Sequence, residues 1–322
     1  MILKSGMQLT RERGKLSASV ALGGGGARGV SHIGALRAIL ESGFRIDRIV
    51  GTSIGSLAGS IYATNPNIAD CTASTIDYLE SKEFQTKQAS LYGAHPTNSG
   101  SGQSGVLAWY DRIKSFLWAR SLLTRLFTRR ALLKANFLHQ IVAALVPDID
   151  IADCPVPMSI ITVDLKSGEQ IVLEQGSLRK AIVASASIPG VFPPVEWENM
   201  LLCDFGVLDS LPTAVASSFY SDVTIGVDVG PTLSPVDDCE SGLHVLLRMD
   251  EIGESLIRSR SLELADVLIR PEVGQFQWFD FSQPREMIDS GLNAGRDSME
   301  SAGYFACESV ARESEMSLAQ QA

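Results

Sequence analysis

Cysteine and histidine are scarce in this chain, which has five cysteines and four histidines among 322 residues. The cysteines are odd in number and far apart, and they form neither a C-x-x-C pattern nor a cluster with histidine. Disulfide frameworks and zinc sites both need such close spacing. The sequence therefore indicates no disulfide scaffold, no bound metal and buried thiols in a reducing cytoplasm.

Long hydrophobic runs are missing as well. No stretch approaches the ~18 consecutive apolar residues of a membrane-spanning helix, and residues 1–16 lack the apolar segment of a secretory signal. The net charge of −10 at pH 7 argues against general nucleic-acid binding. We therefore expect a cytoplasmic protein without a nucleic-acid partner, whose contact with a membrane would be peripheral, on its inner face.

The predicted elements at the start of the chain indicate an α/β protein. An apolar strand at 17–22 runs into glycines, and a helical pattern over 30–42 stops at Gly43, a usual helix C-cap. A second strand at 46–50 precedes a small-residue helix at 56–63. This order predicts a mostly parallel sheet with helices on both faces. Further strands and a final helix are expected at 158–163, 169–173, 201–203, 223–229, 267–270 and 284–314.

One domain accounts for most of the chain. We assign it residues 17–305, with 1–16 as an N-terminal extension and 306–322 as a C-terminal tail. Gly, Ser, Asn and Gln dominate residues 86–105, which predicts a mobile loop. Helical periodicity resumes after this loop, so 86–146 is interpreted as a loop followed by a basic helical insertion.

The segment Gly51-Thr52-Ser53-Ile54-Gly55 is the most informative motif. It lies between the second strand and its helix, where a G-x-S-x-G pattern is typical of a nucleophile elbow. Glycine permits the tight turn because it has no Cβ atom. The hydroxyl of Ser53 would then stand clear of the sheet, over the positive end of the following helix. These residues predict a catalytic serine.

A glycine-rich loop, Gly23 to Gly29, closes the first strand and opens the first helix. Its free N–H groups at a helix start would bind negative charge. The charge could belong to a pyrophosphate, because Gly24, Gly26 and Gly29 form a G-x-G-x-x-G pattern with Asp47 as a ribose-binding acid. It could equally belong to a transient oxyanion. The neighbouring serine elbow, and the position of Asp47 at the start of a strand, favour the oxyanion hole.

A serine nucleophile needs a base, and histidine is the usual one. His32 lies one turn into the first helix, His95 lies in the predicted loop, and His139 lies in an apolar helical stretch. His244 could complete a Ser–Asp–His order together with Asp204 or Asp228, but its neighbours carry no catalytic pattern. Histidine is therefore a weaker candidate than a carboxylate.

Asp204 is the best carboxylate candidate. It ends the apolar segment Met200 to Cys203 and is followed by Phe205 and Gly206, which places it at a strand end. Burial at such a position raises the basicity of a carboxylate. The alternative is that Asp204 caps the turn through its side chain.

Together these residues resemble the patatin-like phospholipase family, from about Val20 to Ala302 and in the family's order. The resemblance is carried by Gly24 to Gly29 with Arg28, His32-Ile33-Gly34, Gly51 to Gly55, Ala184 to Pro194, Asp204 to Gly206 and Leu211-Pro212. It implies a three-layer α/β/α sandwich that hydrolyses acyl esters of phospholipids, lysophospholipids or neutral lipids, without a metal or organic cofactor. Its implied site consists of Ser53 as nucleophile, Asp204 as proton acceptor, Gly24, Gly25 and Gly26 as oxyanion hole, and Arg28, Gly29, Gly51, Gly55 and Gly206 as supporting residues.

Two positions depart from the family pattern. Phe205 replaces a glycine, and Ser210 stands where asparagine is common. If the glycine position needs a positive φ, Phe205 is strained and re-aims Asp204. If it does not, Phe205 could line the acyl site.

Between Trp109 and His139, basic side chains interleave with aromatic and aliphatic ones. A basic, aromatic-rich amphipathic helix would dock on anionic lipid headgroups. The alternative is an ordinary helix that packs its apolar stripe on the core. For the whole chain, the rivals of a serine hydrolase are a dinucleotide-binding protein and a lipid-binding module that has lost its chemistry.

Overall fold

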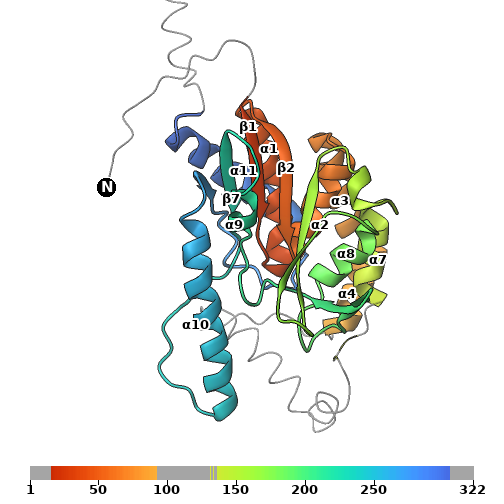
Figure 1. Ribbon diagram of the computed structural model, residues 1–322, viewed down its shortest axis with the longest axis vertical. Coiled ribbons are helices and arrows are strands. Elements are labelled where there is room, and N and C mark those ends of the chain that lie inside the picture. The colour runs from red at the N-terminus through yellow and green to blue at the C-terminus, as the bar shows by residue number, and fades with distance from the viewer. Residues whose placement is uncertain (1–15, 93–130, 132, 134–135, 305–322) are drawn as a thin grey trace, which may run out of the picture.

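The computed structural model describes residues 16–92, 131, 133 and 136–304. Its centre is an eight-stranded sheet with the order β5-β6-β3-β2-β1-β7-β8, in which β4 pairs with β3 (Figure 1). The basic aromatic stretch up to residue 130, His95, and nearly all of the predicted extension and tail lie outside the described residues.

The elements begin in the order that the sequence predicts. They are β1 (Ser17–Leu22), the 3₁₀ turn η1 (Gly26–Val30), α1 (Ser31–Glu41), β2 (Arg45–Thr52) and α2 (Ile54–Thr64). The other strands are β3 (Met158–Asp164), β4 (Gln170–Leu173), β5 (Val195–Trp197), β6 (Met200–Cys203), β7 (Val223–Val227) and β8 (Val267–Ile269). All predicted strands are confirmed to within a residue or two at each end.

The remaining helices are α3 (Ile68–Leu79), α4 (Lys82–Tyr92), α7 (Asn136–Leu145), α8 (Leu178–Ser185), α9 (Thr213–Ala216), α10 (Gly242–Leu262) and α11 (Pro284–Ser301), with a 3₁₀ turn η2 (Ile151–Asp153). Of these, α7 and α11 fall within predicted helical segments. None of the helices in the described ranges is both long and apolar enough to span a bilayer.

The central strand β1 is completely buried because it has a parallel neighbour on each side and helices on both faces. Val20 pairs with Ile49 of β2 and with Ile225 of β7. Val20 and Leu22 face the larger core, whereas Ala21 between them faces a smaller cluster on the opposite side. Such a strand reads as a continuous apolar run rather than as an alternating pattern.

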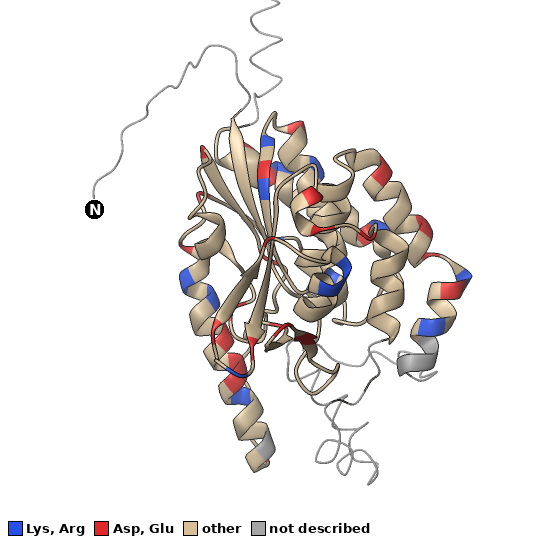
Figure 2. Cartoon of the chain, turned by 45° about the vertical axis from the view of Figure 1, so that its right-hand side comes forward, with Lys and Arg blue, Asp and Glu red and all other residues tan. Residues whose placement is uncertain are grey.

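Helices cover both faces of the sheet (Figure 1), which confirms the predicted α/β fold with a mostly parallel sheet. On the larger core, α1 and α11 lie in close contact, because a Cβ atom on Gly34 would fall 1.9 Å from the carbonyl oxygen of Ile288. On the other face, α9 and the C-terminal end of α10 pack through Ala216 and Leu262. Charged side chains lie mainly along the helices (Figure 2).

The prediction of a loop over 86–105 is wrong for its first part, because α4 continues to Tyr92. The helix is anchored by Phe84, which is buried, and carries an i,i+4 ion pair between Glu83 and Lys87. Among the polar residues of this stretch, Thr86 is exposed, whereas Gln88 is half-buried and donates a hydrogen bond to the carbonyl oxygen of Phe279 at 2.7 Å. Residues 93–105 lie outside the described ranges.

Candidate active site

Ser53 stands at the turn between β2 and α2 with φ 54° and ψ −124°, a conformation that L-residues rarely adopt. The flanking glycines are required by contact. A Cβ atom on Gly51 would lie 2.6 Å from the Cα of Ser56, and one on Gly55 would lie 2.1 Å from the carbonyl oxygen of Leu22. The motif predicted as a nucleophile elbow therefore has the strained geometry of one.

Asp204 lies beside this serine. In the sheet, Thr52 pairs with Ile161 of β3, and Cys203 of β6 pairs with Val163, two residues further along β3. This register brings the residue after β6 to the end of β2. The Ser53 side chain lies close enough to the Asp204 carboxylate to favour its ionised form, which lowers the pKa of Asp204.

The Asp204 carboxylate is almost completely buried, with 2% of the residue exposed. Burial raises its pKa from 3.8 to about 6, against the opposing hydrogen bonds from Ser53 and from the Gly206 N–H group, which lies 2.8 Å from Oδ1. A carboxylate with this pKa is ionised at neutral pH and is more basic than an exposed one. Gly206, predicted as a supporting residue, thus holds the carboxylate in place.

Two serines at the end of α8 position this pair, and the sequence analysis did not single them out. The Ser185 hydroxyl accepts the Ser53 N–H group at 2.9 Å and donates to the carbonyl oxygen of Ile161 at 2.7 Å. The carbonyl oxygen of Ser187 accepts the Asp204 N–H group at 3.0 Å. Their signal in the sequence is the pair of polar residues inside the otherwise apolar segment Ala184 to Pro194.

The structure resolves the question raised by Phe205. Among the described non-glycine residues, positive φ occurs at Ser53 and Glu198, so the backbone of Phe205 is not strained in that way. Its side chain packs against the smaller core cluster around Ala21 and Val50. The hypothesis that a strained Phe205 re-aims Asp204 is therefore wrong, and Phe205 is not among the residues that line the cavities beside Ser53.

The glycine loop meets the elbow at Gly24, where a Cβ atom would lie 3.4 Å from that of Ser53. The Gly24 N–H group, however, donates to the carbonyl oxygen of Ser210 at 2.8 Å. The prediction that Gly24 supplies an oxyanion N–H group does not hold in this structure. A Cβ atom at Gly24 would make only ordinary van der Waals contact with Ser53, so space alone does not require glycine there.

Gly25 and Gly26 remain as donors, because within the described part of the chain their N–H groups have no protein acceptor. Neither position has room for a side chain. A Cβ atom would lie 2.7 Å from the carbonyl oxygen of Val229 at Gly25, and 2.1 Å from that of Trp278 at Gly26, where φ is +62°. The loop therefore presents two N–H groups beside the serine, which is the arrangement of an oxyanion hole.

Arg28 and Gly29 brace this loop. The Arg28 guanidinium is buried and donates through Nε to the carbonyl oxygen of Phe276 at 2.9 Å. A Cβ atom on Gly29 would lie 2.2 Å from the side chain of Ile54, so glycine allows η1 to pack against the start of α2. Both residues thus hold the glycine loop against its neighbours, and their role as supporting residues of a catalytic site stays a prediction.

We expect Gly25→Ala to lower kcat for a soluble ester by about 10²-fold, because the new Cβ collides with the Val229 backbone and displaces an oxyanion donor. Gly253→Ala is the matched control, since a Cβ there meets nothing within 4 Å. Steady-state kinetics at matched circular-dichroism spectra measure the difference. An unchanged kcat for Gly25→Ala would show that this loop does not donate hydrogen bonds to the oxyanion.

Among the contacts that the structure shows for the three histidines within the described residues, none involves Ser53. His32 is completely buried, its Nε2 contacts the carbonyl oxygen of Gly23 at 2.8 Å, and burial lowers its pKa to about 4. His139 lies exposed on α7, and His244 lies in the first turn of α10. Asp228, its suggested partner, forms an ion pair with Arg258 at 3.0 Å instead.

The position of Asp47 contradicts the dinucleotide-binding interpretation, because Asp47 does not lie near the glycine loop. Asp47 lies near the amino end of β2, where Arg45 donates to its carboxylate at 2.6 Å. The glycine loop follows the carboxyl end of β1, and β1 and β2 are parallel. The glycine loop and Asp47 therefore lie at opposite ends of these two parallel strands.

Two cavities meet at Ser53. One, of about 100 Å³, has apolar walls from α2, α7 and neighbouring segments, including Leu57, Ile141 and Phe281. The other, of about 260 Å³, is the more polar of the two and is called the polar cavity below; Asp204, the glycine loop and acidic residues of α10 contribute to its lining. The serine therefore lies where a hydrocarbon chain and a polar group could be held on either side of one bond.

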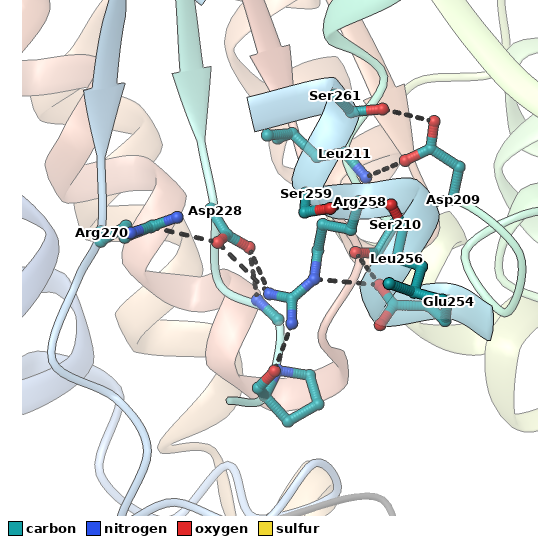
Figure 3. Close-up of polar contacts among 12 residues, drawn as sticks. Asp209, Ser210, Leu211, Asp228, Glu254, Leu256, Arg258, Ser259, Ser261 and Arg270 are labelled. Atoms are coloured by element: carbon teal, nitrogen blue, oxygen red, sulfur yellow. Dashed lines mark hydrogen bonds and ion pairs between the residues drawn. The ribbon is translucent and has the colours of Figure 1, made fainter. Parts of the chain in front are cut away.

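Arg258 holds α10 against this site (Figure 3). Its buried guanidinium contacts Asp228, after β7, at 3.0 Å and Glu254 at 3.1 Å. Glu254 in turn accepts the Ser210 hydroxyl at 2.6 Å. Ser210, the second departure from the family pattern, thus joins the Gly24 loop to α10 through its backbone and side chain.

The comparisons with known proteins agree with this geometry. The family model described as patatin-like phospholipase matches residues 20–217, more than half of the chain. The chain belongs to the patatin-like phospholipase family. In this family member, the matched range contains the glycine loop, Ser53, Asp204 and Ser210, whereas α10 and α11 follow it.

Two sequence relatives and one solved structure are similar to different shares of this patatin-like chain. An uncharacterised NTE family protein of Mycobacterium bovis is 32% identical over 241 residues, which are 71% of this chain and 54% of that protein. A patatin-like phospholipase domain-containing protein of Caenorhabditis elegans is 28% identical over 306 residues, 87% of this chain and 20% of that protein. The crystal structure of VipD from Legionella pneumophila aligns with 15% identity and a TM-score of 0.42, over 90% of this chain and 67% of that one. The chain thus spans about half the length of its mycobacterial relative.

Proposed function

We propose that this protein is a serine acyl-ester hydrolase of the phospholipase A or lysophospholipase type. The observation that carries the proposal is the position of the strained Ser53 beside the buried, basic Asp204, at the junction of two cavities of different polarity. Membership of the patatin-like phospholipase family supports a lipid ester as the substrate.

The proposed reaction has two halves. Asp204 takes the proton as Ser53 Oγ attacks the ester carbonyl carbon, and the N–H groups of Gly25 and Gly26 hold the resulting oxyanion. The intermediate collapses by breaking the bond to the alcohol oxygen, to which Asp204 returns the proton. Asp204 then deprotonates a water molecule, whose oxygen attacks the acyl carbon of acyl-Ser53. The second intermediate collapses by breaking the bond to Ser53 Oγ, to which Asp204 returns the proton, and the fatty acid leaves.

The two cavities supply the proposed substrate orientation. The acyl chain would enter the apolar cavity beside Leu57 and Ile141, where its burial from water is favourable. The glycerol and head group would occupy the polar cavity, between the glycine loop and α10. The scissile bond would then lie over Ser53.

We expect the purified protein to release fatty acid from phosphatidylcholine or lysophosphatidylcholine dispersions, and a Ser53→Ala preparation made in parallel to release none. Mass spectrometry of the released fatty acids measures this result. Cleavage of short soluble esters with no release from long-chain lipids would reduce the proposal to a simple esterase. Binding of lipid without any cleavage would favour the degenerate lipid-binding module.

A further inference from the structure

The helix α10 has an apolar outer face. Its exposed side chains include Leu246, Met249, Leu256 and Ile257, and the first two of these residues are 69% and 60% exposed. Positions separated by three, seven or eleven residues lie on one side of a helix. These side chains therefore form a stripe along α10 that faces away from the sheet.

The opposite side of the same helix belongs to the active site. Glu251 and Glu254 line the polar cavity that contains Ser53, and Arg258 binds the helix to Asp228. Whatever the outer stripe contacts therefore lies on the far side of α10 from the cavity that contains Ser53.

The start of α10 extends beyond the sheet at the edge where the dyad lies. The helix connects the carboxyl end of β7 to the amino end of β8, so its first turns lie at the carboxyl edge, which also holds Ser53. Its 21 residues span about 30 Å, whereas the 5 residues of β7 span about 17 Å. Figures 1 and 2 show this end of α10 projecting below the strands.

The charges favour a neutral surface over an anionic one. Residues 242–247 contain no Lys, Arg, Asp or Glu. Arg248, the next residue, is held by Glu251 at 2.9 Å and by the carbonyl oxygen of Ser234 at 2.8 Å. The chain as a whole carries a net charge of −10, which repels anionic headgroups.

We propose that the start of α10 is the docking element of this enzyme on lipid surfaces, where Val245, Leu246 and Met249 insert into a zwitterionic bilayer or micelle. The proposal rests on the proposed function, since a lipid substrate places that surface at the mouth of the cavity. Because the start of α10 projects past the carboxyl ends of the strands, docking here would hold that end of the molecule, which contains Ser53, near the headgroup layer. This surface is distinct from the basic stretch 109–139, most of which lies outside the described residues.

The test uses the double variant Leu246→Gln/Met249→Gln, which keeps helix-forming residues while it removes apolar surface. Binding to phosphatidylcholine vesicles is measured by co-sedimentation in a Ser53→Ala background, so that hydrolysis plays no part. We expect binding to weaken about tenfold or more. In the active background, kcat/KM for a short soluble ester should stay unchanged, while the apparent KM for vesicle lipid should rise.

Tyr220→Ser is the matched control, because Tyr220 is 105% exposed and precedes β7 at the opposite edge of the sheet. It should leave vesicle binding intact. A second variant, Leu246→Ala/Met249→Ala, should also weaken vesicle binding. It tests the same apolar side chains if the glutamine variant does not fold.

Three results would overturn the docking proposal: equal vesicle binding by the double variant, binding to anionic vesicles alone, or a dimer that the double variant dissociates. The last result would identify a second copy of the chain as the occupant of the stripe. Failure of the proposed function is separately visible, as vesicle binding through α10 without ester cleavage.

Discussion

Replacing Ser53 with alanine should lower kcat for every ester substrate by about 10⁴-fold or more, because no covalent intermediate can then form. The loss should appear in kcat at equal substrate affinity, since the cavities and the glycine loop are untouched. Steady-state kinetics on a soluble ester, with protein concentration set by absorbance, measure it.

Ser60→Ala is the control for this change. Ser60 lies on the same helix, α2, and its buried hydroxyl has no hydrogen-bond partner in the described structure, so its loss should be nearly neutral. Turnover by Ser53→Ala within tenfold of the unmodified protein, at matched folding, would show that another group attacks the ester.

Replacing Asp204 with asparagine should lower kcat by about 10³-fold to 10⁴-fold, because the amide keeps the shape of the side chain but cannot take the Ser53 proton. Asp209→Asn is the control, since Asp209 accepts from Ser261 and the Leu211 N–H group rather than from the nucleophile. A loss of less than about tenfold in Asp204→Asn would indicate a different base.

The raised pKa of Asp204 gives this prediction a pH dependence. The base must be ionised, so kcat/KM should fall as the pH drops through about 6, and the residual activity of Asp204→Asn should lack this step. Stability responds in the opposite sense. Because the folded pKa lies above the unfolded value, the contribution to stability is present below about pH 4 and is lost as the pH rises through about 6.

Asp204→Asn should therefore be more stable than the unmodified protein at neutral pH, by about 1–3 kcal/mol. Thermal unfolding at neutral pH and near pH 4 measures the difference, which should shrink at the lower pH. A variant that is inactive and also less stable would indicate that Asp204 mainly holds the fold.

Much of the site can be predicted from the sequence because its geometry depends on glycine. Gly51, Gly55, Gly26 and Gly29 each stand where a Cβ atom would collide with neighbouring atoms, so the motif and the contact coincide. The continuous apolar run of β1 likewise marks a strand buried on both faces.

Other features depend on contacts between distant segments, which a local pattern does not contain. The acceptor of the Gly24 N–H group is Ser210, and the residue that fixes the Ser53 backbone is Ser185. Phe205 turned out to face a second core cluster, which only the fold defines. The helix α10 was not predicted because its apolar residues lie on its exposed face as well as toward the protein.

Labelling with a fluorophosphonate tests directly whether Ser53 is an activated nucleophile. The measurement is the intact mass after incubation, followed by peptide mapping, with Ser53→Ala and Asp204→Asn treated in parallel. We expect one adduct on Ser53 of the unmodified protein, no adduct in Ser53→Ala, and much slower formation of the adduct in Asp204→Asn. Folded protein that remains unlabelled, or that is labelled at another residue, would contradict this expectation.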